Sequence, residues 1–203
     1  CFCSLVVLFH DLCRLFQPYR RLPMEKDKKG VWVKTAHGDL NGVYYTYEIR
    51  HDDITEETID IYARTAGVNG AMGMVIDLEE TNPAGWHNYH PEPLEHYTDA
   101  VIYEMHVRDF SIDKSGNFCY KGRFLAFVEK GVINAAGDKI GIDHLKELGV
   151  THVHLMPSFD YQTVDETRLN VPQFNWGYDP QNFNCPEGSY STNPYDGRAR
   201  VAE

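Results

Sequence analysis

The chain has 203 residues, of which 24% are charged and 42% hydrophobic, and its formal net charge is −11. This length suits one full domain, or one domain and part of another, and the composition is that of a globular protein, not a disordered or fibrous one. Surplus carboxylates find nothing to neutralise on nucleic acid or on an anionic membrane, so the charge argues against both as partners. The sequence begins at Cys1 and not at a methionine, which predicts a piece of a longer protein.

The cysteines predict reduced thiols. They are odd in number, contain no CxxC pair and so do not suit a disulfide framework: Cys1, Cys3, Cys13, Cys119 and Cys185. No apolar stretch approaches the ~18–20 residues that a membrane-spanning helix needs. A targeting segment would precede Cys1, so a cytoplasmic and a secreted location both stay open.

The first half of the chain predicts short strands separated by turns. The strand candidates are residues 5–9, 31–35 and 43–49, with weaker ones at 58–63 and 72–77. Asn41 and Gly42 form a pair that favours a two-residue hairpin turn, so we expect 31–35 and 43–49 to be antiparallel neighbours. Short strands between turn signals are typical of a β-sandwich.

A boundary between two regions falls near residues 81–97, where the breaker sequences NPAG at 82–85 and HPEP at 90–93 frame a polar run that we interpret as a linker. Beyond it, residues 101–107 and 150–156 are apolar strand patterns of the buried type, and 141–149 predicts a short helix ending at a capping glycine. The order strand, helix, strand predicts a βαβ unit with parallel strands. The proline-rich stretch 158–195 predicts a long functional loop.

Histidine and glutamate side chains on the two predicted strands form one candidate site. Glu104 and His106 lie two residues apart and face the same way, as do His152 and His154. A His-x-His pair on a barrel strand can open a metal site. Such a site would need further ligands from strands beyond this sequence. Hydrogen-bonded polar side chains are therefore the favoured interpretation, and we predict no metal site.

Six carboxylates follow Pro157: Asp160, Asp165, Glu166, Asp179, Glu187 and Asp196. Glycosidases work with two carboxyl groups held about 5–9.5 Å apart. Nothing in the sequence selects such a pair. We interpret these residues as solvated acidic positions of a loop, except for Asp179, whose neighbours distinguish it.

Residues 174–180 read FNWGYDP and place three aromatic rings beside an amide and a carboxylate. A sugar site combines aromatic platforms for the apolar C–H faces with Asn or Asp groups for the hydroxyls. Gly177 would let the backbone approach a neighbour closely, and Pro180 would set the exit direction of the chain. The alternative interpretation is an aromatic cluster that pins a long loop.

Three further stretches accompany this box: VIYEMHVRDF at 101–110, IDHLKELGVTHVHLMPSF at 142–159 and PEGSYSTNPY at 186–195. Together with the box they resemble the start of the catalytic barrel of type I pullulanases, the α-1,6-debranching members of glycoside hydrolase family 13. The usual form of the box is YNWGYDP, so only Phe174 departs from it, by losing a hydroxyl.

The first half resembles the family 48 carbohydrate-binding module that precedes this barrel, through GVWV at 30–33, GDL at 38–40, YYTY at 44–47, GVNG at 67–70 and VIDL at 75–78. The resemblance implies a multi-domain β plus α/β fold. Residues 1–84 would be an N-terminally truncated, immunoglobulin-like β-sandwich and 85–97 a linker. Residues 98–203 would be the first βα units of a (β/α)8 TIM barrel, truncated at the C-terminus.

The resemblance also implies roles for the box. Tyr178 would stack on the sugar ring next to the scissile bond, Asp179 would bond its hydroxyls, and Trp176 and Asn175 would shape the loop. These are binding roles for an α-glucan partner.

In the first half, Trp32, Tyr45 and Tyr47 are candidates for glucan binding. The alternative for the two tyrosines and for Trp32 is that they form sandwich core and cross-strand pairs.

The family's mechanism is retaining, with an aspartate nucleophile, a glutamate acid/base and a second aspartate on later barrel strands. None of those motifs occurs here, so we predict no catalytic residue in this chain and no turnover by it alone. The longer protein would hydrolyse α-1,6-glucosidic linkages in pullulan, amylopectin, glycogen and limit dextrins. No cofactor is implied, and calcium binding by the longer protein stays open. The alternatives are an isoamylase or glycogen-branching-type member of the family, and a non-catalytic glucan-binding protein.

Overall fold

The computed structural model describes residues 3–10 and 20–203. The strands are β1 (Cys3–His10), β2 (Arg20–Pro23), β3 (Glu25–Lys26), β4 (Trp32–Val33), β5 (Tyr44–His51), β6 (Ile54–Thr58), β7 (Gly73–Met74), β8 (Ile102–Met105), β9 (His152–Leu155), β10 (Phe159–Tyr161) and β11 (Pro180–Pro186). The α-helices are α1 (Ile142–Glu147) and α2 (Gly197–Ala202). Short 3-10 turns connect them: η2 (Val68–Gly70), η3 (Leu78–Thr81), η4 (Trp86–Asn88), η5 (Tyr97–Asp99), η6 (Phe124–Val128), η7 (Glu166–Arg168) and η8 (Gly188–Tyr190).

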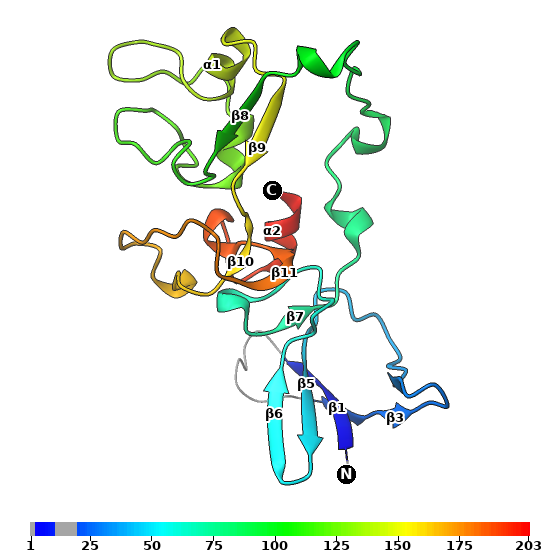
Figure 1. Cartoon of the computed structure of the whole chain (residues 1–203). Coiled ribbons are helices and arrows are strands. Elements are labelled where there is room, and N and C mark those ends of the chain that lie inside the picture. The colour runs from blue at the N-terminus through cyan, green and yellow to red at the C-terminus, as the bar shows by residue number, and fades with distance from the viewer. Residues whose placement is uncertain (1–2, 11–19) are drawn as a thin grey trace.

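The first half of the chain builds an antiparallel sheet in the order β2-β1-β5-β6, with β7 also paired to β5 (Figure 1). The strand predicted at residues 5–9 is confirmed as the centre of β1. Side chains alternate along β5: Tyr44 and Thr46 are buried, whereas Tyr45 and Tyr47 are partly exposed on the opposite face. This alternation follows from the two-residue period of a strand.

The hairpin predicted at Asn41 and Gly42 is wrong. β4 pairs with β3, while β5 pairs with β1, β6 and β7. A type I′ turn needs a positive φ at both central residues, and only Gly42, at +83°, has one. Asn41 instead uses its side chain, which donates to Glu80 at 2.6 Å and accepts from the backbone of Asp77 at 3.0 Å. The tight reversal lies between β5 and β6, where Asp52 has a φ of +52°.

Of the weaker strand candidate at 58–63, only Thr58 lies in a strand, at the end of β6. Of the candidate at 72–77, only the two residues of β7 do. In the part of the chain that the structure describes, the first half contains one five-stranded sheet and the β3–β4 pair. The second layer of the expected sandwich is not among these described residues. The free thiols of Cys3, Cys119 and Cys185 agree with the prediction. Cys1 and Cys13 lie outside the described residues.

The predicted βαβ unit is present. β8 and β9 pair in parallel from Ile102–His152 to Met105–Leu155, and α1 lies between them in the sequence. The helix ends as predicted, because Gly149 follows its cap with a left-handed φ of +74°. Both strands have the apolar pattern of buried strands, yet every residue of β9, and all of β8 except Met105, is exposed. A parallel sheet becomes buried when further strands and helices cover it, and residues 3–10 and 20–203 form no closed barrel.

The stretch 158–195 is more ordered than predicted. β10 and β11 pair antiparallel, with irregular register, and η7 and η8 flank them. Pro180 and Pro186 stand at the two ends of β11, positions at which a strand tolerates a missing N–H. Because prolines usually interrupt strands, these two residues led to the prediction of a loop where β11 lies.

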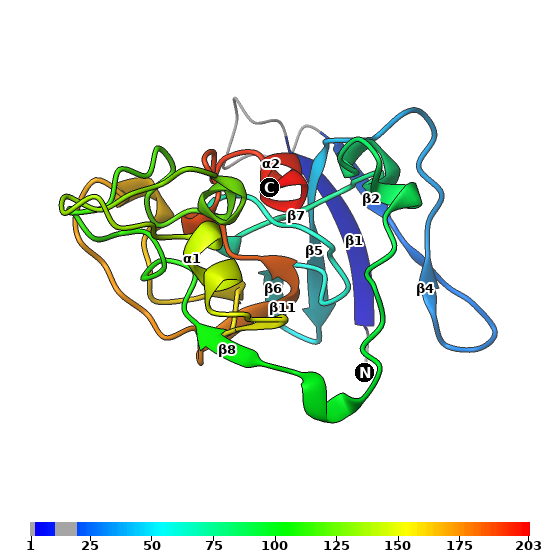
Figure 2. The ribbon, with the colours of Figure 1, turned by 90° about the horizontal axis from the view of Figure 1, so that it is seen from above.

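In Figure 1 the β8–β9 pair and α1 lie at one end of the molecule, the β1–β5–β6 sheet lies at the other, and β10, β11 and α2 lie between them. Residues 83–99 are mostly exposed, and both views show this segment running along the outside (Figures 1 and 2). This course suits the predicted linker, although the division into 1–84, 85–97 and 98–203 stays a prediction. Among the described helices, none combines the length and apolarity that crossing a membrane requires.

Hydrogen bonds join the first sheet to α2. The Tyr44 hydroxyl donates to the carbonyl of Tyr195 at 2.6 Å and accepts from the N–H of Gly197 at 3.1 Å. The Thr65 hydroxyl donates to the carbonyl of Gly197 at 2.7 Å. These bonds are buried or partly buried and connect positions more than 130 residues apart in sequence. Segments of the first half and of the C-terminal region therefore stabilise one another.

We predict that Tyr44→Phe lowers the free energy of unfolding by about 1–3 kcal/mol, because the buried N–H of Gly197 loses its acceptor. Tyr62→Phe is the matched control, since that side chain is 76% exposed and its change should stay within about 0.5 kcal/mol. Urea unfolding of both variants measures the difference. Equal stabilities for the two would contradict the role of Tyr44.

Candidate functional site

The loop of residues 174–180 follows β9 and β10 and ends at Pro180, the first residue of β11. Its conformation is set by Asn175. The Asn175 Oδ1 atom accepts from the N–H of Gly177 at 2.7 Å, and its Nδ2 donates to Asp179 Oδ1 at 2.7 Å. The same amide donates to the Thr163 hydroxyl. One side chain therefore ties together the start, middle and end of the loop.

Gly177 brings the loop against the end of β9. Its φ is +88°, in the left-handed region, and a Cβ at this position would collide with the carbonyl oxygen of Pro157. Both features exclude larger residues. The close approach expected at this glycine is thus present, with the protein's own backbone as the neighbour.

Asp179 is half-buried and already hydrogen-bonded on both carboxylate oxygens. Oδ1 accepts from Asn175, and Oδ2 accepts from the Thr163 hydroxyl at 2.9 Å. A carboxylate has about four lone-pair sites, so further acceptor capacity remains for sugar hydroxyls. The network holds this capacity at a defined position.

The aromatic rings of the loop face solvent. Trp176 is 56% and Tyr178 71% exposed. Phe174 packs edge-to-face against Trp176, with ring centroids 5.3 Å apart, and lies 5.2 Å from the ring of His106. Exposed rings on a loop with internal hydrogen bonds provide the flat apolar platforms that a sugar ring needs.

The histidine candidates separate into two environments. His106 is buried, and its Nε2 lies 2.8 Å from the carbonyl of Asn175 and 3.0 Å from the hydroxyl of Tyr190. His154 is exposed and lies 3.3 Å from Glu104 across the β8–β9 pair. The structure therefore does not gather these side chains into one ligand set. Their contacts match the favoured interpretation, hydrogen-bonded polar side chains.

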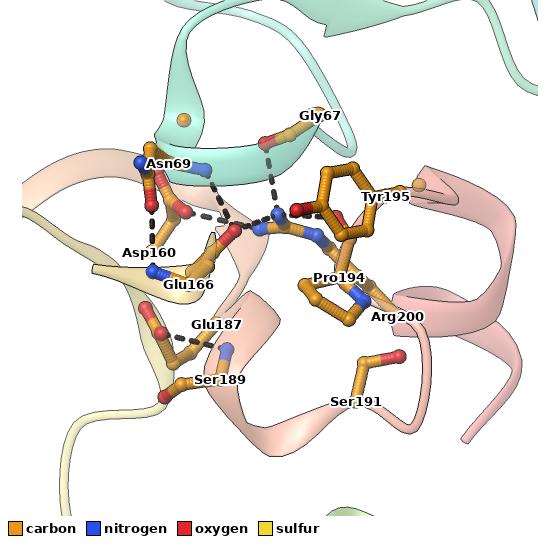
Figure 3. A network of polar contacts seen from close by, with 12 residues as sticks. Gly67, Asn69, Asp160, Glu166, Glu187, Ser189, Ser191, Pro194, Tyr195 and Arg200 are labelled. Atoms are coloured by element: carbon orange, nitrogen blue, oxygen red, sulfur yellow. Dashed lines mark hydrogen bonds and ion pairs between the residues drawn. The ribbon is translucent and has the colours of Figure 1, made fainter. Parts of the chain in front are cut away.

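The interpretation of the loop carboxylates as solvated is wrong for three of them. Asp160, Glu166 and Glu187 are 1%, 3% and 0% exposed, and each brings a carboxylate oxygen within 4.8 Å of the others. Figure 3 shows Arg200 between two of them, with Nη1 3.0 Å from Asp160 Oδ1 and Nη2 2.5 Å from Glu166 Oε2. This group of four residues is called the Arg200 cluster below.

Backbone groups complete the Arg200 cluster. Arg200 Nη2 also donates to the carbonyls of Gly67 at 2.8 Å and Pro194 at 2.9 Å (Figure 3). Glu187 accepts from the N–H groups of Tyr161 at 3.0 Å and Ser189 at 2.8 Å. The guanidinium already supplies the positive charge that this spacing of carboxylates would otherwise draw from a metal ion.

Burial sets the acidity of the cluster. It raises the pKa of Asp160 and of Glu166, against the opposing effect of Arg200, and it raises the pKa of Glu187 to about 7. No local pattern indicates this buried cluster, because Arg200 follows Asp160 by 40 residues and Glu166 by 34. The other two acidic candidates cap helical turns: Asp165 accepts from Thr167, and Asp196 from Arg198.

The candidates in the first half are less exposed than the loop. The hydroxyls of Tyr45 and Tyr47 both reach Asp60 Oδ2, at 2.8 and 3.4 Å, and their rings pack edge-to-face. Burial raises the pKa of both tyrosines. Trp32 is partly exposed on β4, in a separate two-stranded pair (Figure 2). The structure brings the two tyrosines together but places Trp32 on a different sheet.

A pocket of about 630 Å³ adjoins the loop, and the sequence did not reveal it. Its lining includes Arg108, Lys121, Arg123, Gln173, Asn175 and Tyr190. Trp176 and Tyr178 do not line this pocket. Asn175 therefore stands between the pocket and the exposed rings of the loop.

We predict that Arg200→Met destabilises the protein by about 3–5 kcal/mol, because two buried carboxylates lose their partner. Arg198→Met is the matched control: its ion pair with Asp196 is exposed, so the loss should be no more than about 1 kcal/mol. Chemical denaturation measures both. A loss at Arg200 no larger than the control would contradict the clustered charges.

Glu187→Gln should flatten the dependence of stability on pH. The folded-state pKa of about 7 lies above that of an unfolded glutamate, so the folded protein holds a proton that the unfolded chain has released. Stability from this group is fully present below about pH 4 and is lost as the pH rises through about 7, by up to about 1.4 kcal/mol per pH unit. Melting curves between pH 5 and 8 test this, and an unchanged slope in the variant would refute it.

No protein-family model matches the chain. Among curated proteins, it is 41% identical over 187 residues to the pullulanase of Bacillus subtilis, covering 91% of this chain and 25% of that protein. It is 30% identical over 239 residues to the chloroplastic pullulanase 1 of Arabidopsis thaliana, covering 95% and 24%. The chain thus spans about a quarter of the length of these relatives.

The comparison with solved structures also matches pullulanases. The pullulanase of Paenibacillus barengoltzii, in complex with maltohexaose and α-cyclodextrin, superposes with a TM-score of 0.93 at 45% identity, covering 98% of this chain and 31% of that one. Because nearly all of the chain is matched in both sequence and structure, it belongs to the pullulanase family, in which it corresponds to one region of longer members.

Proposed function

We propose that this chain is the glucan-binding part of a longer debranching glycoside hydrolase, and that the loop of residues 174–180 contacts the sugar. The observation that carries the proposal is the exposure of Trp176 and Tyr178 on a loop whose backbone is held by Asn175 and Asp179. Rings held in place lose little conformational freedom when a ligand arrives. A relative solved with maltohexaose supports an α-glucan as the ligand class.

Within this proposal, Tyr178 stacks on a sugar ring and Asp179 accepts from its hydroxyls. Trp176 extends the apolar platform, and Asn175 holds the loop in shape. Residues 98–203 are then the start of a (β/α)8 barrel, consistent with the parallel β8–β9 pair and α1. In the region 1–84, Trp32 is the better-placed glucan contact, because the hydroxyls of Tyr45 and Tyr47 already bond Asp60.

The longer protein would cleave α-1,6-glucosidic bonds by a retaining mechanism, using carboxylates outside these 203 residues. The spacing within the Arg200 cluster resembles the ~5 Å of a retaining pair. Asp160 and Glu166, however, are buried and paired with Arg200, and Glu187 is buried against two backbone N–H groups. A sugar does not reach them, so we assign the cluster a structural role.

The pairing of Asn175 with Asp179 also bears on the alternatives within the family. Both residues, followed by Pro180, favour a pullulanase over an isoamylase or branching-type member, whose boxes differ at the flanking positions. The hydrogen bond between them gives this difference a physical meaning, because a change at either position would release the loop.

Binding of this chain to immobilised pullulan, and of maltohexaose in solution, tests the proposal. We expect Tyr178→Ala and Trp176→Ala to weaken binding by about 3–10-fold each, the value of one aromatic contact. Tyr62→Ala, which removes a ring of similar exposure from the first half, is the control and should bind like the unchanged chain. A parallel reducing-sugar assay on pullulan should show no turnover.

Two outcomes would contradict the proposal. Unchanged binding in both loop variants would place the glucan site elsewhere. Measurable hydrolysis by the chain alone would mean that a catalytic pair exists among its own carboxylates.

A further inference from the structure

We propose that His106 is the positioning residue of the sugar-binding loop, acting as a neutral imidazole that donates its Nε2–H to the carbonyl of Asn175. This inference rests on the proposed function, since it assigns the element that keeps that loop in its binding shape. His106 is buried, with 5% of its surface exposed, and it contacts the loop at the carbonyl of Asn175. Neither the box nor its spacing indicates this residue.

The protonation state follows from the partners. The carbonyl of Asn175 can only accept, and Nε2 lies 2.8 Å from it, so Nε2 carries the proton. The N–H of Asp109 points at Nδ1 from 3.4 Å, so Nδ1 is the acceptor. One tautomer satisfies both contacts, and it is neutral. A second proton on Nδ1 would face the backbone N–H of Asp109, and the Asp109 carboxylate oxygen lies 3.9 Å from Nδ1, beyond hydrogen-bond distance.

Packing holds the ring in one orientation. Its centroid lies 5.2 Å from that of Phe174 and 5.8 Å from that of Tyr190, which is nearly perpendicular to it. The Tyr190 hydroxyl, 3.0 Å from Nε2, adds a second contact at the same atom. A buried ring with neighbours on two sides cannot follow the loop if the loop moves.

His106 also stands on a defined base, because it immediately follows β8, whose last residue pairs with β9. The hydrogen bond thus ties the loop to the parallel strands across 69 residues of sequence. The Asn175 backbone is fixed by this bond, and its side chain in turn orients Gly177 and Asp179. His106, held at the end of β8, therefore fixes the position of the residues proposed to contact the sugar.

The test compares His106→Gln with His106→Asn and His106→Phe in the full chain. Glutamine places an amide N–H about as far from the backbone as Nε2, whereas asparagine is too short and phenylalanine has no donor. His154→Gln is the matched control on the neighbouring strand, where the imidazole is exposed. The primary measurement is hydrogen exchange of the Gly177 N–H, which reports the loop directly, relative to amides shared by β1 and β5. The second measurement is maltohexaose binding.

We expect His106→Phe and His106→Asn to speed exchange at Gly177 about tenfold relative to the β1–β5 amides, and to weaken maltohexaose binding by a similar factor. His106→Gln should stay within about threefold of the unchanged chain, and His154→Gln should not differ from it. A purely packing role would instead place the glutamine and asparagine variants together, and that result would overturn the proposal. It would also be overturned if exchange at Gly177 and at the sheet changed in parallel.

The experiment distinguishes a failure of the proposed glucan binding from a failure of the proposed role of His106. If the unchanged chain does not bind maltohexaose, the proposed function is wrong, yet exchange at Gly177 still decides whether His106 orders the loop. If phenylalanine prevents folding, the comparison of glutamine with asparagine decides the same question.

Discussion

The buried guanidinium of Arg200 is the constraint on which the rest of this structure depends. Its ion pairs reach Asp160 and Glu166, and its remaining bonds reach the carbonyls of Gly67 and Pro194. A charge in the interior is tolerated only when its partners are in place. The segment before η2, β10, η7 and the C-terminal helix must therefore assemble together around this one side chain.

Space for this cluster comes from the backbone. Gly188 lies so close that a Cβ there would collide with both Arg200 and Glu166. From the same turn, Ser189 donates to Glu187 and Tyr190 packs beside His106. The turn η8 thus connects the buried Arg200 cluster on one side with the loop of residues 174–180 on the other, so the two are parts of one packed unit.

The β8–β9 end of the molecule contrasts with this centre. β8 and β9 are exposed, although their sequences have the apolar character of buried parallel strands. The chain matches only about a quarter to a third of its relatives' length. We propose that in the longer protein further strands cover this pair, while the loop of residues 174–180 stays open to the glucan.

The sequence alone determined the features that depend on near neighbours. The alternation along β5, the end of α1 at Gly149 and the chemistry of the loop from Phe174 to Pro180 follow from residues a few positions apart. The side chains proposed for sugar contact could be named this way, because their order along the chain is itself the motif.

The tertiary structure alone decided which strands pair and which charges are buried. β4 and β5 have similar local patterns, yet their partners are β3 and β1, and the turn at Asn41 was diverted by contacts to Asp77 and Glu80. Acidic residues look alike in a sequence. Asp160 and Glu166 became buried because Arg200, more than 30 positions away, is placed between them by packing that no local pattern encodes.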